Sequence, residues 1–126
     1  MRQNLFDSGL WDSIFQRGLK LRSVTETLSA DKTIDKDEGV SFFLKEAAEG
    51  LTTTRTVNLP DPSDVENENV VFFLHHLGGD NTTPPTLVVQ QTTTTSAETV
   101  ATLEEGETAV LFNNGATWAG LVGSNT

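Results

Sequence analysis

The residues able to perform chemistry begin with two histidines, His75 and His76, which stand side by side in an apolar run. Such a run predicts a strand, and adjacent residues of a strand point to opposite faces. The two imidazoles therefore cannot bind the same metal ion within one chain. A threefold axis between copies would gather three equivalent histidines, and this is the one route from the pair to a metal site.

A second metal-binding pattern matches in spacing but fails in residue type. Asp35, Asp37 and Glu46 match positions 1, 3 and 12 of a calcium-binding loop, but Val40 stands where that loop requires glycine. The residues that follow also indicate a strand. We therefore predict a solvated acidic loop, with no metal and no cofactor.

Catalytic constellations are also missing from the sequence. The chain has no cysteine, no glycine-rich phosphate loop and no serine in the setting of a nucleophile. Its acids are numerous, but they cluster in loops and turns, whereas a glycosidase holds two carboxylates across a sugar on a larger scaffold. We predict that the protein is not an enzyme.

The net charge of −10 is distributed unevenly along the 126 residues. Residues 1–36 carry six basic and five acidic side chains, whereas the rest of the chain carries Lys45 and Arg55 against 13 acidic side chains. The acidic part will repel nucleic acid, because affinity for nucleic acid comes from cationic contacts to phosphates. The sequence has no signal-peptide pattern and no stretch near the ~20 apolar residues of a membrane span, so we expect a soluble protein made in a cytoplasm.

Residues 1–36 are expected to form an extended N-terminal arm with a short helical turn near residues 12–16. Its large apolar residues recur at helical spacing: Phe6, Leu10, Trp11, Ile14 and Phe15. Gly9 and Gly18 oppose a longer helix, because glycine weakens helix interiors. Aromatic residues near a terminus need burial, either on the chain's own domain or on a partner subunit, and the sequence leaves both open. Residues 22–39 are polar and indicate a linker or loop.

Residues 37–126 are expected to form an all-β domain, a small antiparallel β-sandwich or barrel similar to a jelly roll. Short apolar or alternating runs predict strands at residues 40–44, 51–59, 70–76, 87–95, 99–103, 108–112 and 117–122. The run at 70–76 is the most apolar and predicts the central strand, while Asn114 and Gly115 predict a hairpin turn. Only 36% of the residues are hydrophobic, so we expect the domain to gain burial by assembly with itself or with a partner.

A pattern of strand and turn residues in this domain resembles a known family. Thr102 and Leu103 are followed by GETAVLF at residues 106–112 and NGATW at residues 114–118, and RTVNLPD stands upstream at residues 55–61. The combination resembles small β domains of tailed-phage virion proteins, which occur in tail and head fibres and in capsid decoration (cement) proteins. The resemblance covers about residues 51–122 and carries over no catalytic residue.

The resemblance implies a structural virion protein of a bacteriophage. As a cement protein it would bind the outer capsid surface, after assembly in the host cytoplasm, and stabilise the shell by bridging neighbouring capsid subunits. The implied partners are the major capsid protein and further copies in a homotrimer, with no nucleic acid and no membrane. On this hypothesis the capsid-binding residues of the arm are Phe6, Leu10, Trp11, Ile14, Phe15, Arg17, Lys20 and Arg22. The residues expected to pack the core or the trimer are Val57, Val71, Phe73, Phe112 and Trp118.

A head or tail fibre segment, or a host-receptor-binding module, is the alternative hypothesis. The exposed connection at residues 78–85 would then contact the receptor. Fibres usually have a long shaft, and this sequence has no internal repeat and no coiled-coil heptad. The length therefore favours the cement protein.

Overall fold

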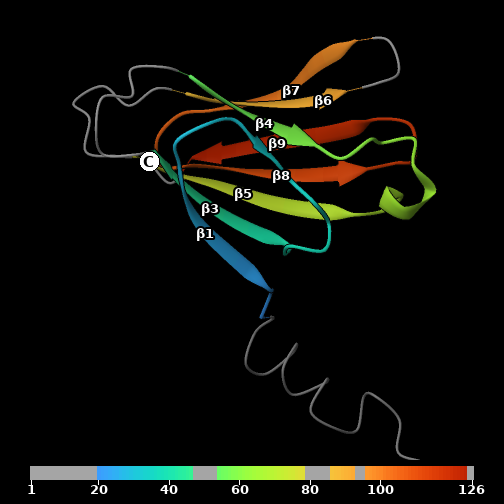
Figure 1. The fold of residues 1–126 in the computed structure, drawn as a ribbon, viewed down its shortest axis with the longest axis horizontal. Coiled ribbons are helices and arrows are strands. Elements are labelled where there is room, and N and C mark those ends of the chain that lie inside the picture. The colour runs from blue at the N-terminus through green and yellow to red at the C-terminus, as the bar shows by residue number, and fades with distance from the viewer. Residues whose placement is uncertain (1–19, 47–53, 79–85, 93–95, 125–126) are drawn as a thin grey trace, which may run out of the picture.

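Two β-sheets packed face to face make up the computed structural model, which describes residues 20–46, 54–78, 86–92 and 96–124 (Figure 1). The five-stranded sheet has the order β1 (Ser23–Leu28), β3 (Ser41–Glu46), β5 (Val71–Gly78), β8 (Glu107–Asn113) and β9 (Trp118–Ser124). The four-stranded sheet has the order β2 (Lys32–Thr33), β4 (Arg55–Leu59), β6 (Leu87–Thr92) and β7 (Ala97–Leu103). A single turn of 3-10 helix, η2 (Val65–Asn67), precedes β5. The all-β sandwich predicted from the sequence is confirmed.

The strand directions correct the expectation of an antiparallel domain. From β1 to β6 the chain crosses to the other sheet after each strand, so every second strand runs the same way. The pairs β1–β3, β3–β5, β2–β4 and β4–β6 are consequently parallel. Only the later pairs, β5–β8, β6–β7 and β8–β9, are antiparallel. Patterns along a strand reveal which faces are buried but not which strand lies beside it, and so the parallel half was missed.

The boundary of the arm at residue 36 is also wrong for the part that the structure describes. Residues 22–39 were predicted as a linker, yet they contain β1 and β2, one strand in each sheet. β1 looked like a loop because it is an edge strand whose outward side chains are Ser23, Thr25 and Thr27, with only Val24 and Leu28 as apolar residues. Residues 1–19, with the helical turn expected there, lie outside the described residues.

An aromatic cluster fills the space between the sheets. Phe72 on β5 stacks on Trp118 of β9, with ring centroids 5.3 Å apart, and meets the Phe42 ring of β3 edge-on at 5.7 Å. All three rings are buried, and Val57 of β4 is fully buried in the same core. The aromatic rings lie at the separations that aromatic pairs prefer. Val57 and Trp118 therefore occupy the core positions predicted for them.

Two predictions for the C-terminal half of the chain are confirmed, the central place of one strand and the position of one hairpin. β5 is the middle strand of its sheet, as the apolar run at 70–76 predicted. The β8–β9 hairpin turns through residues 114–117, which begin with Asn114 and Gly115. Gly115 takes a φ of 95° that glycine adopts without strain, whereas Asn114 does not take the positive φ of a two-residue Asn-Gly turn. Backbone N–H groups of the turn also donate to the side-chain oxygens of Asn113 and Asn114. Local turn chemistry thus fixes this hairpin.

The Lys32 ammonium joins the edge strands of the two sheets. Lys32 lies on β2, and its Nζ is 2.7 Å from Glu26 Oε2 on β1 and 3.0 Å from Glu38 Oε2. The Nζ also lies 6.0 Å from the centre of the Phe42 ring, and the Lys32 side chain is only 10% exposed. Burial lowers the Lys32 pKa, but the hydrogen bonds and charges of the two glutamates outweigh burial and raise this pKa above its ordinary value.

Replacing Lys32 with methionine is expected to lower the free energy of unfolding by about 1–3 kcal/mol at pH 7, because two glutamates lose their shared cation. Folding raises the pKa of Lys32, so its contribution is complete below the ordinary lysine pKa of 10.5 and is lost as pH rises through the raised value. Urea unfolding of the two proteins should therefore converge at high pH. Lys36→Met is the control, since Lys36 pairs with exposed Asp37 and its replacement should lower the free energy of unfolding far less. Equal losses in the two variants would contradict the stabilising link.

Candidate docking face

The two histidines point to opposite sides of β5, as predicted. His76 is fully buried between the sheets, where its Nδ1 accepts a hydrogen bond from the Gly78 N–H at 2.9 Å. His75 lies on the outer side of the five-stranded sheet, with its Nδ1 2.6 Å from Thr108 Oγ1. Among the residues that the structure describes, no group of three or more His, Cys, Asp or Glu is arranged to hold a metal ion. Within the same part of the chain, no helix has the length and hydropathy needed to cross a bilayer.

The arm residues predicted to bind a capsid fall largely outside the described residues. Phe6, Leu10, Trp11, Ile14, Phe15 and Arg17 all belong to that part of the chain. Lys20 is exposed at the start of the described chain. The Arg22 guanidinium donates hydrogen bonds to the backbone carbonyls of Lys36 and Asp37, so it braces the turn that follows β2.

The outer side of the five-stranded sheet, here called the apolar face, gathers large apolar side chains from four neighbouring strands. They come from positions that alternate with buried residues, since successive side chains of a strand point to opposite faces. The strand registers place Phe73 beside Val110 and Val110 beside Leu121, while Val71 pairs with Phe112. The members of the apolar face are Phe43, Val71, Phe73, Val110, Phe112 and Leu121.

Exposure and charge set this face apart from the rest of an acidic protein. Leu121 is 73% exposed, Phe112 43% and Val110 37%. The chain carries 18 acidic residues, yet none occupies a described outward strand position of the five-stranded sheet. Burial of an exposed leucine or phenylalanine contributes about 1.5–3 kcal/mol, and no carboxylate here would have to be desolvated. The face is therefore suited to contact with another protein.

The outer side of the four-stranded sheet has the opposite character. Its outward positions are mostly hydroxyl and amide side chains: Thr56, Asn58, Gln90, Thr92, Thr99 and Thr102, with Val88 and Ala97 as apolar exceptions. Such groups are satisfied by water and gain little from burial. The sandwich thus has one polar side and one apolar side, and only the apolar one has the composition of a docking surface.

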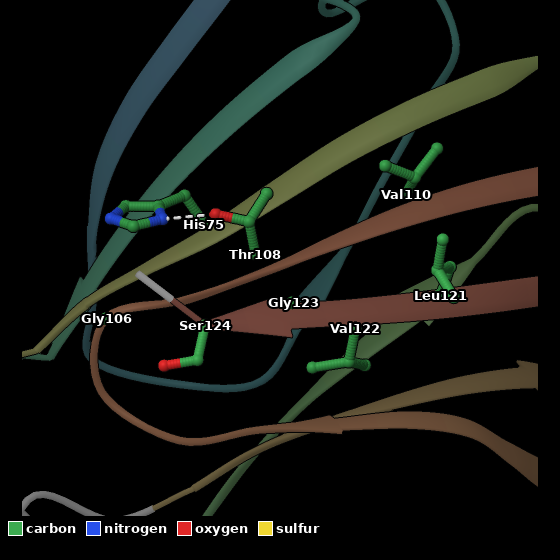
Figure 2. Close-up of a pocket in the computed structure, with 8 residues that line it drawn as sticks. All are labelled: His75, Gly106, Thr108, Val110, Leu121, Val122, Gly123 and Ser124. Atoms are coloured by element: carbon green, nitrogen blue, oxygen red, sulfur yellow. Dashed lines mark hydrogen bonds between the residues drawn. The ribbon is translucent and has the colours of Figure 1, made fainter. Parts of the chain in front are cut away.

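Two grooves mark the apolar face on either side of the His75–Thr108 contact. The larger, of about 470 Å³, runs beside β9 and is lined by His75, Gly106, Thr108, Val110, Leu121, Val122, Gly123 and Ser124 (Figure 2). The smaller, of about 140 Å³, lies over β3 and β5 and includes Phe43 and Phe73. The Phe43 and His75 rings meet edge-on, with centroids 6.0 Å apart. The lining side chains of both grooves are mostly apolar, with His75 and Thr108 as polar groups that the two grooves share.

The five residues predicted to pack the core or a trimer divide between two places. Val57 and Trp118 are buried between the sheets, whereas Val71, Phe73 and Phe112 stand together on the apolar face. Sequence reasoning missed Phe43, Val110 and Leu121. The available signal was that residues 70–74 and 109–112 are continuously apolar, which makes both sides of β5 and β8 hydrophobic rather than one.

Comparison with protein-family models, with curated proteins and with solved structures finds no match to this chain.

Proposed function

We propose that this protein is a structural virion protein that binds the outer surface of a phage capsid as a cement protein and bridges neighbouring capsid subunits. The observation that carries the proposal is the apolar face, which is free of acidic side chains at its described strand positions on a chain of net charge −10. A monomer of this size gains nothing from such a surface in water. Contact with another subunit, the major capsid protein or a further copy of this chain, accounts for it.

On this proposal the protein stabilises the shell by binding alone, without any chemical reaction. A protein that binds only the assembled shell shifts the equilibrium towards assembly by linkage. Many copies on one shell also multiply weak contacts through avidity. Phe73 and Phe112 would be buried in these contacts, while the Thr-rich side of the sandwich faces solvent.

The proposal is tested first by copy number in purified particles of the virus that encodes the chain. A cement protein should be present at the same order of abundance as the major capsid protein, as measured by a quantitative gel. A few copies per particle would overturn the cement function and favour the fibre or receptor-binding alternative.

Variants on the two sides of the sandwich then test which surface binds. The double variant Phe73→Ser with Phe112→Ser should lose binding to shells stripped of the protein, because both changes remove apolar area from the apolar face. Val88→Ser on the polar side is the matched control and should bind as the unaltered protein does. Co-sedimentation with stripped shells measures both. Unchanged binding of the double variant, with its fold intact by circular dichroism, would contradict docking through this face.

A further inference from the structure

Three of the four sheet edges carry features that discourage pairing with another strand. β1 turns the charged Glu26 inward, where it pairs with Lys32 of the other sheet. β2 has only two residues. β7 contains exposed Glu98, and its pairing with β6 shifts register after Val89. Short edges, inward charges and register irregularities are the means by which β proteins avoid edge-to-edge association.

β9 is the edge strand without such a feature. Its seven residues, WAGLVGS, include no charge and no proline, and its pairing with β8 runs from Trp118 to Ser124 in one register. Figure 1 shows it as the last strand of its sheet, beyond β8. A regular, uncharged edge of this length is a template for a further strand.

The hydrogen-bond pattern identifies the backbone groups of β9 that point away from β8. The Asn113 N–H donates to the Val70 carbonyl and the Trp118 N–H donates to Gln91 Oε1, so this opposed pair exchanges no ladder hydrogen bonds. Opposed pairs of an antiparallel ladder alternate between bonded and non-bonded. Ala119, Leu121 and Gly123 therefore bond to β8, and the backbone groups of Gly120 and Val122 point away from it.

The side chains around this edge favour a neutral, apolar partner. Leu121 is the most exposed residue of the apolar face, and Val122 on the same strand is 38% exposed. The larger groove continues over the strand to Val122, and a Cβ on Gly123 would meet no atom within 4 Å, so the surface is open there (Figure 2). A second chain of net charge −10 can approach at an uncharged strand without bringing carboxylates together.

We propose that two copies of this chain pair their β9 strands antiparallel about a twofold axis at Leu121. In this register Gly120 of each copy exchanges backbone hydrogen bonds with Val122 of the other, which uses the outward-pointing groups. Leu121 then faces its own counterpart in a non-bonded pair, where side chains are closest. Two five-stranded sheets become one continuous sheet, and the two apolar faces lie on the same side. The pairing goes beyond the proposed function, because it needs no shell.

A disulfide test reads the register directly, because the chain contains no cysteine. Leu121→Cys should oxidise to a covalent dimer on a non-reducing gel, since opposed Cα atoms of a non-bonded pair lie about 4.5 Å apart, within disulfide range. Ala119→Cys is the matched control on the same strand and face. Its counterpart lies four residues away along the strand, about 13 Å, and should not cross-link. Absence of the Leu121→Cys dimer, or equal cross-linking of both variants, would overturn the register.

A proline substitution in β9 should block pairing at this edge while the fold stays intact. Val122→Pro deletes an N–H that points away from β8, which an edge strand tolerates. The mass in sedimentation equilibrium should fall to half that of the unaltered protein, whatever other contacts join the copies, with an unchanged circular dichroism spectrum. The pairing would be overturned if the unaltered protein were a monomer or a trimer, or if the variant had the same mass as the unaltered protein. Neither result bears on copy number in virions, so failure here is distinguishable from failure of the cement function.

Discussion

Replacing Phe72 with alanine is expected to lower the free energy of unfolding by about 3–5 kcal/mol, a large share of the ~5–15 kcal/mol of a typical domain. Phe72 is 1% exposed and contacts both Trp118 and Phe42 in the centre of the sandwich. The loss has two parts, the transfer free energy of the ring and the cavity left where the surrounding rings cannot close. Urea unfolding followed by far-UV circular dichroism measures it, because fluorescence would combine Trp11 with Trp118.

Phe73→Ala provides the matched control one residue along the same strand. Phe73 points to the apolar face, where it is half-buried, so its truncation should cost about 1 kcal/mol or less. The pair of variants thus separates the two sides of β5 with the same chemical change. Equal destabilisation by the two variants would mean that the Phe73 ring is part of the core. The apolar face would then not be an exposed surface.

The two sides of β5 also explain why the sequence predicted the position of this strand but not what covers its outer side. Residues 70–76 are apolar on both sides, which identifies a central strand but leaves open what covers the outer side. A sheet covered by helices and a sheet that docks on another subunit give the same apolar run. The three-dimensional registers add that Phe73, Val110 and Leu121 form one row that no described element covers.

Prediction was accurate where structure depends on neighbours in sequence and failed where it depends on distant pairing. The β8–β9 hairpin follows from Asn114 and Gly115, and its outcome is local. β1 was missed because its stability comes from β3, whose residues begin at Ser41. Its own side chains are mostly polar, and only the pairing makes it a strand. The parallel half of the fold was invisible to the sequence for the same reason.

Asn113, a polar residue beside the β8–β9 turn, is expected to contribute as much to the stability of the fold as the aromatic core. Asn113 is fully buried at the end of β8. Its Nδ2 donates to the carbonyls of Pro62 and Asn67 at 3.1 and 2.8 Å, and its Oδ1 accepts from the Gly115 N–H at 2.9 Å. One side chain therefore ties the segment between β4 and β5 to the β8–β9 turn. Buried amides of this kind stabilise a fold only while every partner is present.

Replacing Asn113 with aspartate is expected to lower the free energy of unfolding by about 3 kcal/mol or more at pH 7. The carboxylate has the same shape, but it loses both donated hydrogen bonds and faces the carbonyls of Pro62 and Asn67 with a buried negative charge. Burial and these carbonyls would raise the pKa of the new carboxyl in the folded state. Its destabilisation should therefore be small below the unfolded aspartate pKa of about 3.9 and grow as pH rises above it.

Urea unfolding at pH 4 and pH 7 measures this dependence, with Asn58→Asp as the control for adding one negative charge to the chain. Asn58 points outward from β4 on the polar side and is half-buried, so its replacement should cost about 1 kcal/mol or less at both pH values. The deficit of the Asn113 variant relative to this control isolates the two lost hydrogen bonds and the buried charge. A deficit that does not grow between the two pH values would show that the carboxylate reaches water, and the tie between the β8–β9 turn and the segment before β5 would then be loose enough to open.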